Sequence, residues 1–339
     1  MKVLAPSVEI LRTGLETEHI LPEQFIEKVG RTCYKSEDKI TEDSAAKFVG
    51  NLIKRGHEAM IEHWNLIFRF EHYPDFTRFM ESKESMEFKG YQFKLRVTDN
   101  EVDGERRCII SGNMRAWRDY IKAWADDVGF IPSMLFTVIR DNPIFFPEYQ
   151  SKVPKNGGTG YLVPITVNDL TNRERQVHQD ITMKFVCDRG VSHEIVRHRV
   201  ASFAQESTRY CNYSQDKFGK EITVIRPSWC NEGEDKYERW LDGCLRAEES
   251  YFDLLNAGCT PQEARSALPN STKTEIILTM NLNGWKHFFD LRCAPSAHPD
   301  MQEVAKMAER LFDTEIGIER LKDLMSEKLG INKSQLSGE

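Results

Sequence analysis

Residues 181–210 read ITMKFVCDRGVSHEIVRHRVASFAQESTRY. The apolar run at 181–187 predicts a buried strand, the residues at 188–190 break it, and 191–199 are predicted to be helical. That helix ends in Arg-His-Arg at 197–199, and a polar segment with hydroxyl and amide side chains follows. Guanidinium groups bind phosphate through paired, charge-assisted hydrogen bonds, and free backbone N–H groups can converge at such a junction. The stretch therefore predicts a nucleotide site rather than an exposed basic patch.

The overall composition makes this basic segment more informative. The chain has 339 residues, enough for one large domain or two ordinary ones, and 40% of them are hydrophobic, a globular balance. Its net charge is −7, which argues against non-specific binding to nucleic acid. Any anion site must therefore be a local one.

The sequence carries no sign of a membrane segment, a secretion signal or a metal centre. No apolar run approaches the roughly 20 residues that span a membrane, and residues 1–6 lack the apolar core of a signal peptide. The eight cysteines are scattered without a Cys-x-x-Cys pair, so zinc and redox dithiol chemistry gain little support. Reduced cysteines in a cytoplasmic enzyme are the simplest interpretation.

The N-terminal half predicts helices, a strand and then a region of different character. Helices are expected at 22–29 and 41–56, and strands at 66–70, 88–97 and 107–110. Residues 111–113 should cap a further helix that carries Trp117, Tyr120 and Trp124. We expect these aromatic side chains to lie in a core rather than on a ligand-binding surface.

The C-terminal half predicts long helices around one strand. Helices are expected at 234–256, 283–291 and 299–325, and the strand at 274–280. Thr260 to Glu263 form a capping box with Pro261 at the first helical position, and this short helix carries Arg265. The helix at 283–291 delivers Arg292 at its end.

One cluster combines His57-Glu58 with Glu62-His63. Two histidines and two carboxylates in seven residues are a possible metal site, but the histidines are six residues apart, which is not the zinc-binding H-E-x-x-H spacing. We do not expect a metal here. Hydrogen bonding at a helix end, or a ligand contact by His57, fits this segment better.

Three further sequence features have an ordinary structural explanation as an alternative to a role in ligand binding. Arg265, taken alone, reads as a surface or ion-paired residue. Asn281 and Asn283 stand at a strand-to-helix junction, where asparagine commonly caps the helix. Arg292 at the C-terminal end of a helix is a favourable partner of the helix dipole. None of these features is specific by itself.

Taken together and in order, the motifs resemble those of flavin-dependent thymidylate synthases. The Arg-His-Arg triplet at 197–199, followed after seven residues by Ser207 and then by Arg209-Tyr210, resembles the signature of that family. The resemblance covers residues 1–71 and 181–325. Its other segments are Gly56-His57-Glu58 with Glu62-His63, Cys187 to Glu194, Glu263-Ala264-Arg265 with Leu268-Pro269, and Asn281 with Leu291-Arg292.

The resemblance implies a specific reaction and assembly. The family converts dUMP to dTMP with methylenetetrahydrofolate as carbon donor, and NADPH reduces a bound FAD that supplies the hydride. No cysteine nucleophile is needed, so none of the eight cysteines has to be catalytic. The family forms homotetramers whose subunits share active sites, and we expect the same here, with no nucleic-acid or membrane partner.

The resemblance also implies residue roles. Arg292 is the expected catalytic residue, because the matching arginine favours ionisation of the uracil ring at N3, and a fixed cation lowers the pKa of such a group. The expected dUMP-binding residues are Glu194, Ile195, Val196, Arg197, Gln205, Glu206, Ser207, Thr208, Arg209, Arg265 and Arg292. The expected FAD-binding residues are His57, Ala59, Arg197, His198, Arg199, Gln205, Asn281, Asn283 and His287.

Five of the matched positions depart from common family residues. Ala204 stands where asparagine is frequent, and Gln205 where glutamate is common. Ala59 replaces a serine or threonine that often helps to bind FAD, Asn283 replaces a frequent arginine, and His287 a frequent asparagine. These changes affect the flavin contacts more than the dUMP contacts.

The expected fold is α+β, with long helices packed on a mainly antiparallel sheet. No G-x-G-x-x-G follows a strand, so FAD is not expected on a Rossmann unit. Residues 1–71 and 179–330 should form the catalytic domain, 331–339 a C-terminal tail, and 72–178 an insertion of unreadable role. The alternative to a synthase is a catalytically inactive regulator of the same fold that binds nucleotide or flavin.

Overall fold

The structure is a computed structural model that describes residues 1–15, 20–154, 161–207, 213 and 220–317. It confirms the expected α+β class, with helices and mainly antiparallel sheets. The chain divides into two compact units. The first unit comprises Met1–Thr13, Val29–Asp38 and Ile181–Glu339, and the second comprises Gly14–Lys28 and Lys39–Asp180.

The first unit is built on a four-stranded sheet in the order β2-β7-β10-β8. Strand β2 pairs antiparallel with β7, and β8 pairs antiparallel with β10, where Ile276 lies opposite Gln205. A second, parallel pair joins β1 to β9. The strands are β1 (Lys2–Leu4), β2 (Ser7–Arg12), β7 (Asp180–Asp188), β8 (Ser202–Gln205), β9 (Thr223–Ile225) and β10 (Lys273–Asn281).

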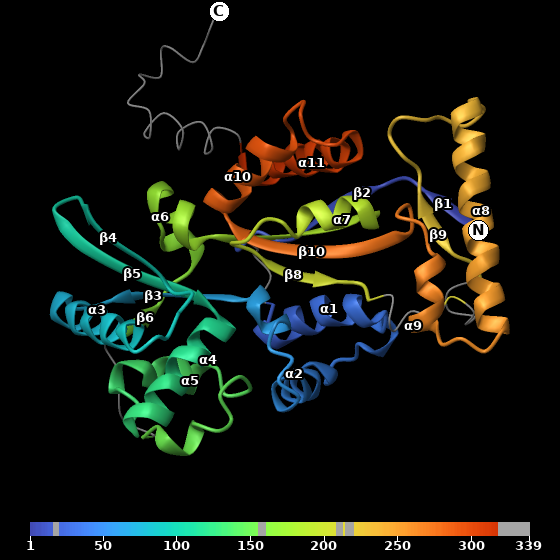
Figure 1. Cartoon of the computed structure of the whole chain (residues 1–339). Helices are drawn as coiled ribbons and strands as arrows, with labels where there is room; N and C mark the ends of the chain where they lie inside the picture. Colours follow the sequence, from blue (N-terminus) through green and yellow to red (C-terminus); the bar gives the residue numbers. More distant parts are fainter. Residues whose placement is uncertain (16–19, 155–160, 208–212, 214–219, 318–339) are drawn as a thin grey trace, which may run out of the picture. The chain divides into compact units, whose positions relative to one another are not determined.

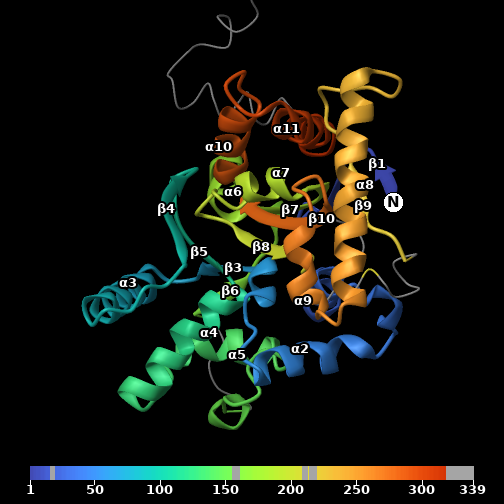
Figure 2. The same ribbon diagram turned by 45° about the vertical axis from the view of Figure 1, so that its right-hand side comes forward.

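Helices α7, α10 and α11 lie on the same side of this sheet (Figure 1 and Figure 2). Trp285 of α10 and Phe185 of β7 are fully buried between them. The hydroxyls of Thr182 on β7 and Thr279 on β10 hydrogen bond to each other at 2.8 Å inside the core. The helices are α7 (Arg189–Ile195), α8 (Asp235–Asn256), α9 (Pro261–Ala264), η8 (Arg265–Ala267), α10 (Leu282–Arg292), α11 (Pro299–Phe312) and η9 (Asp313–Gly317).

Two strands of the first unit lead directly into helices through a capping side chain. At the end of β7, the carboxylate of Asp188 accepts the backbone N–H of Val191 at 2.7 Å. At the end of β10, the side chain of Asn281 accepts the N–H of Gly284 at 2.9 Å, which is the capping role named as the structural alternative to a ligand contact. Each cap satisfies an N–H that has no partner within the helix. The ends of α7 and α10 are thereby fixed relative to adjacent strands.

The helix predicted for 191–199 ends at Ile195, four residues earlier than expected. The backbone N–H groups of Arg197 and His198 bond to carbonyls three residues back, a tighter turn than the α-helix makes. The reason is the burial of His198, whose imidazole turns inward from this last turn. The Arg-His-Arg triplet therefore stands on a turn after the helix, not on its exposed face.

The second unit contains a four-stranded antiparallel sheet in the order β4-β5-β3-β6. The strands predicted at 66–70 and 181–187 are both formed, and each belongs to a different sheet. The strands are β3 (Asn65–Phe70), β4 (Arg96–Val102), β5 (Glu105–Asn113) and β6 (Leu162–Pro164).

The helices of the second unit include one that the sequence did not predict. The strand expected at 88–97 is wrong, because α3 occupies residues up to Phe88 and β4 begins only at Arg96. Gly90, with φ of +95°, reverses the chain between them, a conformation that favours glycine. The helices are α2 (Ser44–Lys54), η2 (Met60–His63), α3 (Tyr73–Phe88), α4 (Met114–Ala123), η3 (Trp124–Val128), η4 (Ser133–Leu135), α5 (Phe136–Asp141), η5 (Gln150–Lys152), η6 (Val167–Asp169) and α6 (Asn172–His178); α1 (Pro22–Tyr34) and η1 (Glu37–Lys39) contribute residues to both units.

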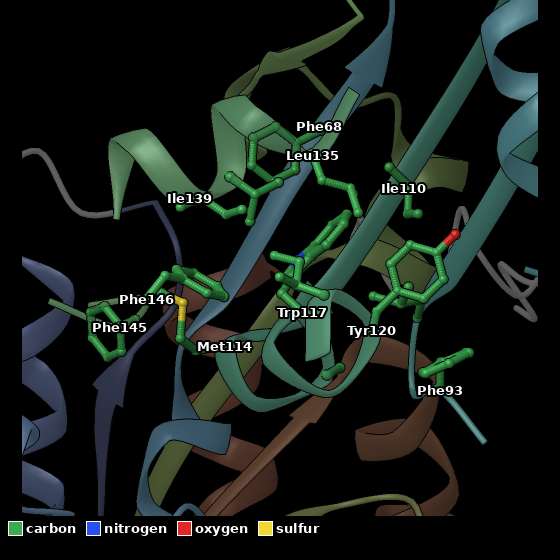
Figure 3. Packing of buried hydrophobic residues seen from close by; sticks show 14 of the residues in the cluster. Phe68, Phe93, Ile110, Met114, Trp117, Tyr120, Leu135, Ile139, Phe145 and Phe146 are labelled. Carbon is green, nitrogen blue, oxygen red and sulfur yellow. The ribbon is translucent and has the colours of Figure 1, made fainter. Parts of the chain in front are cut away.

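Helix α4 is the centre of the second unit's core (Figure 3). As predicted, Asn113 caps it, accepting the N–H of Ala116 at 2.8 Å. Trp117 and Tyr120 are fully buried, and the ring of Trp117 meets Phe68 of β3 edge-on. The aromatic side chains of this helix are therefore core residues, as the sequence indicated.

Candidate functional site

The residue predicted to be catalytic, Arg292, is held by three hydrogen bonds at the end of α10. Its Nη1 donates to the carboxylate of Glu194 at 2.8 Å, and its Nη2 donates to the backbone carbonyl of Glu194 at 2.8 Å. Its Nε donates to Nε2 of His198 at 3.0 Å. The structure thus brings together three residues predicted from distant parts of the sequence. They meet because β7 and β10 are neighbours and each leads straight into a helix.

His198 is a neutral acceptor in this arrangement. Arginine has only donors, so the Nε2 that receives its N–H must carry a lone pair, and the ring proton belongs on Nδ1. Burial, together with the positive charge of Arg292 and the neighbouring His287, lowers the pKa of His198 from 6.5 to about 4. The imidazole also packs on Phe288, with ring centroids 4.8 Å apart. His198 therefore orients the guanidinium without competing with its charge near pH 7.

The depressed pKa of His198 predicts a pH-dependent contribution to stability. The unfolded imidazole binds a proton near pH 6.5 and the folded one only near pH 4, so the contribution is present above pH 6.5 and is lost as pH falls towards 4. In His198→Gln, an amide oxygen can still accept from Arg292 but does not titrate. Urea denaturation at pH 7.5 and 4.5 should show the wild type losing roughly 1–3 kcal/mol more than this variant. If the two proteins lost the same unfolding free energy between these pH values, His198 would not be a buried, neutral imidazole.

The remaining residues of the basic segment are oriented differently from His198. Arg197 and Arg199 are exposed, and neither guanidinium contacts an acceptor or carboxylate among the residues that the structure describes. Ile195 is buried, whereas Val196 is exposed. Two cations flanking a buried histidine therefore face solvent close to Arg292, which suits an anionic ligand.

Gln205, predicted to contact both ligands, is fixed by two hydroxyls. Its amide donates to Ser192 Oγ of α7 at 2.9 Å and to Thr274 Oγ1 of β10 at 3.2 Å. A side-chain amide has both a donor and an acceptor end, and these two bonds use the donor end. The amide thereby ties the end of β8 to the start of α7. Sequence reasoning did not find Ser192 or Thr274, because a single hydroxyl in a strand or helix carries no recognisable signal.

A buried charge cluster holds the next residue, Glu206. Its carboxylate accepts from Lys273 at 2.9 Å and lies 3.7 Å from Lys35, while Glu275 lies 2.5 Å from Lys35. Burial alone would raise the pKa of Glu275, but Lys273 and Lys35 lower it to about 2. The backbone N–H of Ser207 bonds to the carbonyl of Cys33. The alternation of Lys273 and Glu275 on one face of β10 was the signal that could have revealed this cluster.

Several other predicted site residues are exposed or lie outside the described residues. Asn283 and His287 are exposed on α10, and the ring of His287 is 5.9 Å from that of His198. Arg265 is exposed on η8, after the capping box of Thr260 and Glu263, which the structure confirms. Thr208, Arg209 and the tail at 331–339 lie outside the described residues.

His57 and Ala59, predicted to contact FAD, belong to the second unit. Both are exposed on the turn between α2 and η2, and the N–H of His57 bonds to the carbonyl of Leu52 at 2.9 Å. Within the described ranges, no cluster of three or more histidine, cysteine or acidic side chains is arranged to hold a metal ion. Among the helices that the structure describes, none combines the length and apolar character that a membrane crossing requires.

Comparison with known proteins identifies relatives with matching segments. The chain is 37% identical over 126 residues to the flavin-dependent thymidylate synthase of Pyrococcus furiosus, covering 37% of this chain and 51% of that protein. It is 33% identical over 123 residues to that of Geobacter sulfurreducens, covering 36% and 51%, and 37% identical over 132 residues to that of Sulfurisphaera tokodaii, covering 37% and 49%. The chain thus spans about half the length of the curated relatives it matches.

A solved structure and a family model complete the comparison. A crystal structure of a UMP/dUMP methylase, PolB, from Streptomyces cacaoi is 22% identical, with a TM-score of 0.35 over 43% of this chain and 71% of that chain. The model of the family described as thymidylate synthase complementing protein, Thy1, matches residues 17–78 and 175–316. Because this match covers more than half of the sequence and includes Arg197 to Arg199, Ser207 and Arg292, the chain belongs to the Thy1 family.

Proposed function

We propose that the chain is a flavin-dependent thymidylate synthase, which methylates dUMP to dTMP. Methylenetetrahydrofolate is the carbon donor, and NADPH provides the reducing equivalents through FAD. The proposal is supported by membership of the Thy1 family and by relatives that bear the name of this activity. The observation that carries it is the Arg292 guanidinium at the C-terminal end of α10, fixed there by Glu194 of α7 and by His198 in the turn that follows α7.

Arg292 has the properties required to activate the pyrimidine. Three of its five N–H groups are used by Glu194 and His198, so its plane is set before a substrate binds, while two N–H groups are left to donate outward. A fixed cation beside uracil N3 favours the ionised ring and stabilises the charge that develops on it. Because the arginine is already oriented, little reorganisation is needed during the reaction.

The dUMP phosphate and sugar are proposed to lie along Gln205 to Arg209, with Arg265 from a neighbouring subunit. Gln205 and Glu206 are held rigidly by Ser192, Thr274 and Lys273, as a preorganised binding edge requires. Glu194, Ile195, Val196 and Arg197 are proposed to form the opposite edge of the same pocket.

The exposed residues around His198 fit the flavin cofactor. Arg197 and Arg199 face solvent without a described partner, and a flavin dinucleotide carries two phosphates that such guanidinium groups bind well. Asn281, Asn283 and His287 of the adjoining helix, with His57 and Ala59, complete the proposed contact set. When bound, the flavin would supply the hydride for reduction of the one-carbon group.

We further propose a domain organisation, a homotetramer and a cytoplasmic location. The catalytic domain is assigned to 1–71 and 179–330, and 72–178 to an insertion, since the family match leaves 79–174 uncovered. The homotetramer with shared active sites is proposed from membership of the Thy1 family.

The deciding experiment measures flavin binding and turnover together. The purified full chain, reconstituted with FAD, should show the absorption spectrum of bound flavin. It should oxidise NADPH and form dTMP only when both dUMP and methylenetetrahydrofolate are present. An inactive regulator would bind flavin or dUMP without forming dTMP, and a chain that binds no FAD would exclude the synthase.

A further inference from the structure

Two arginines of helix α4 form ion pairs with the segment that carries His57 and Ala59. Arg115 Nη1 donates to the carboxylate of Glu62 at 2.7 Å. One turn further along α4, Arg118 Nη2 donates to the carboxylate of Glu58 at 3.3 Å. Residues three apart on an α-helix share a face, so the two arginines meet the same segment, with Glu62 in η2 and Glu58 in the turn before it. Two charged contacts therefore bracket the turn on which Ala59 lies.

One partner of each contact is buried. The side chains of Glu62 and Arg118 are 10% and 9% exposed, whereas those of Glu58 and Arg115 are 22% and 43% exposed. Arg118 also donates to Glu148 at 2.8 Å and to the backbone carbonyl of Phe145, so its position is set from three sides. The exposed Lys94 lies 3.7 Å from Glu62 and is a weaker partner. A buried carboxylate that loses its nearest cation keeps most of its desolvation cost, so removing either arginine should loosen the segment.

Helix α4 is itself immobilised by the core of the second unit. Figure 3 shows Met114, Trp117 and Tyr120 packed among the aromatic and aliphatic side chains of that core. The backbone N–H of Met114 donates to the carbonyl of Trp64 at 2.9 Å, and Trp64 directly follows the segment that holds Glu58 and Glu62. The two arginines project from another face of the same turns. The core therefore fixes α4, and α4 in turn fixes residues 58–64.

Only one partner of these ion pairs lies in the part of the chain that the Thy1 family model matches. Residues 57–63 fall inside the Thy1 match, whereas Arg115, Arg118 and Glu148 lie in the uncovered stretch between 78 and 175. We propose that Arg115 and Arg118 are positioning residues for the flavin site: the inserted helix α4 holds Glu58 and Glu62, and with them the turn that presents His57 and Ala59. The inference rests on the proposed function and gives the insertion a role in it.

The test is the affinity of the full-length apoprotein for FAD, measured by fluorescence titration. Arg115→Ala should raise the Kd for FAD roughly twofold to fivefold, the effect of losing one partly exposed ion pair. Arg115→Lys, which keeps the charge, should recover part of that loss. The matched control is Arg106→Ala, another arginine of the insertion, whose partner Asp99 is remote from 57–63 in sequence; its Kd should equal that of the wild type.

Two further readouts separate positioning from general damage. The Kd for dUMP, whose proposed contacts belong to the first unit, should be unchanged in Arg115→Ala. Hydrogen exchange of the amides at 57–63 should accelerate in the same variant, and other amides of the second unit should keep their rates. If Arg115→Ala does not fold, Glu62→Gln, which removes the charge and keeps the size, replaces it with the same expected results.

The outcomes also distinguish this inference from the proposed function. The positioning role is overturned if the wild type binds FAD and Arg115→Ala has the same Kd and the same rates of hydrogen exchange at 57–63. In that case the synthase proposal still stands. A wild type that binds no FAD overturns both proposals.

Discussion

Arg292→Ala is expected to stop dTMP formation while FAD stays bound. A fixed donor aimed at developing negative charge contributes about 10²- to 10³-fold to turnover, and Arg292 is proposed to be both the donor and the cation. The flavin is assigned to other residues, chiefly Arg197 and Arg199, so its binding should change little. The measurement is kcat by dTMP formation, together with the flavin content of the same preparation.

Lys286→Ala is the matched control for that variant. Lys286 lies on the same helix, is also cationic, and pairs with Asp290 near the surface at 2.7 Å. It should keep wild-type turnover, because such an exposed helical pair contributes only a few tenths of a kcal/mol. If Arg292→Ala kept substantial turnover with bound flavin, Arg292 would not be the residue that activates the pyrimidine. Loss of flavin in that variant would mean that Arg292 holds the cofactor instead.

The sequence predicted the parts of the site whose chemistry depends on residue type. Arg292, Glu194 and His198 were predicted as site residues because their order and spacing resemble those of flavin-dependent thymidylate synthases, and the structure places their side chains in contact. The partners that support them were not found. Lys35 and Lys273 are ordinary surface residues by composition, and only the pairing of distant segments around Glu206 reveals the buried charge cluster.

In the fold as well, features set by local sequence were predicted and features set by tertiary contacts were not. Local signals fixed the caps at Asn113 and Asn281, because a capping side chain acts within three residues of its own position. Signals that depend on tertiary contacts failed. Helix α7 ends early because His198 is drawn inward to Arg292, and the expected strand at 88–97 gives way to a helix and a glycine turn. The contacts of α4 with Glu58 and Glu62 were not predicted either, because the partners are 60 and 53 residues apart in sequence.

Trp285→Ala is expected to destabilise the protein more than any other single substitution considered. The indole is fully buried, and its ring lies 5.4 Å from that of Phe288 and 5.7 Å from that of Phe289. Replacing such a ring by a methyl group leaves a cavity and costs about 3–5 kcal/mol of unfolding free energy. The bond from the indole N–H to the carbonyl of Ile181 at 3.0 Å is lost as well. Urea denaturation followed by near-ultraviolet circular dichroism measures the effect.

Two comparison variants make the cause of that loss specific. Trp285→Phe keeps most of the ring volume and should cost about 1–3 kcal/mol, since it lacks the N–H and part of the ring. Trp229→Ala removes an indole that is 45% exposed and should change the unfolding free energy much less. Because Trp285 and Arg292 share α10, the alanine variant should also lose turnover as the helix shifts away from Glu194. A Trp285→Ala protein as stable as Trp229→Ala would show that α10 is not anchored through its indole, and that the position of Arg292 is set by its hydrogen bonds alone.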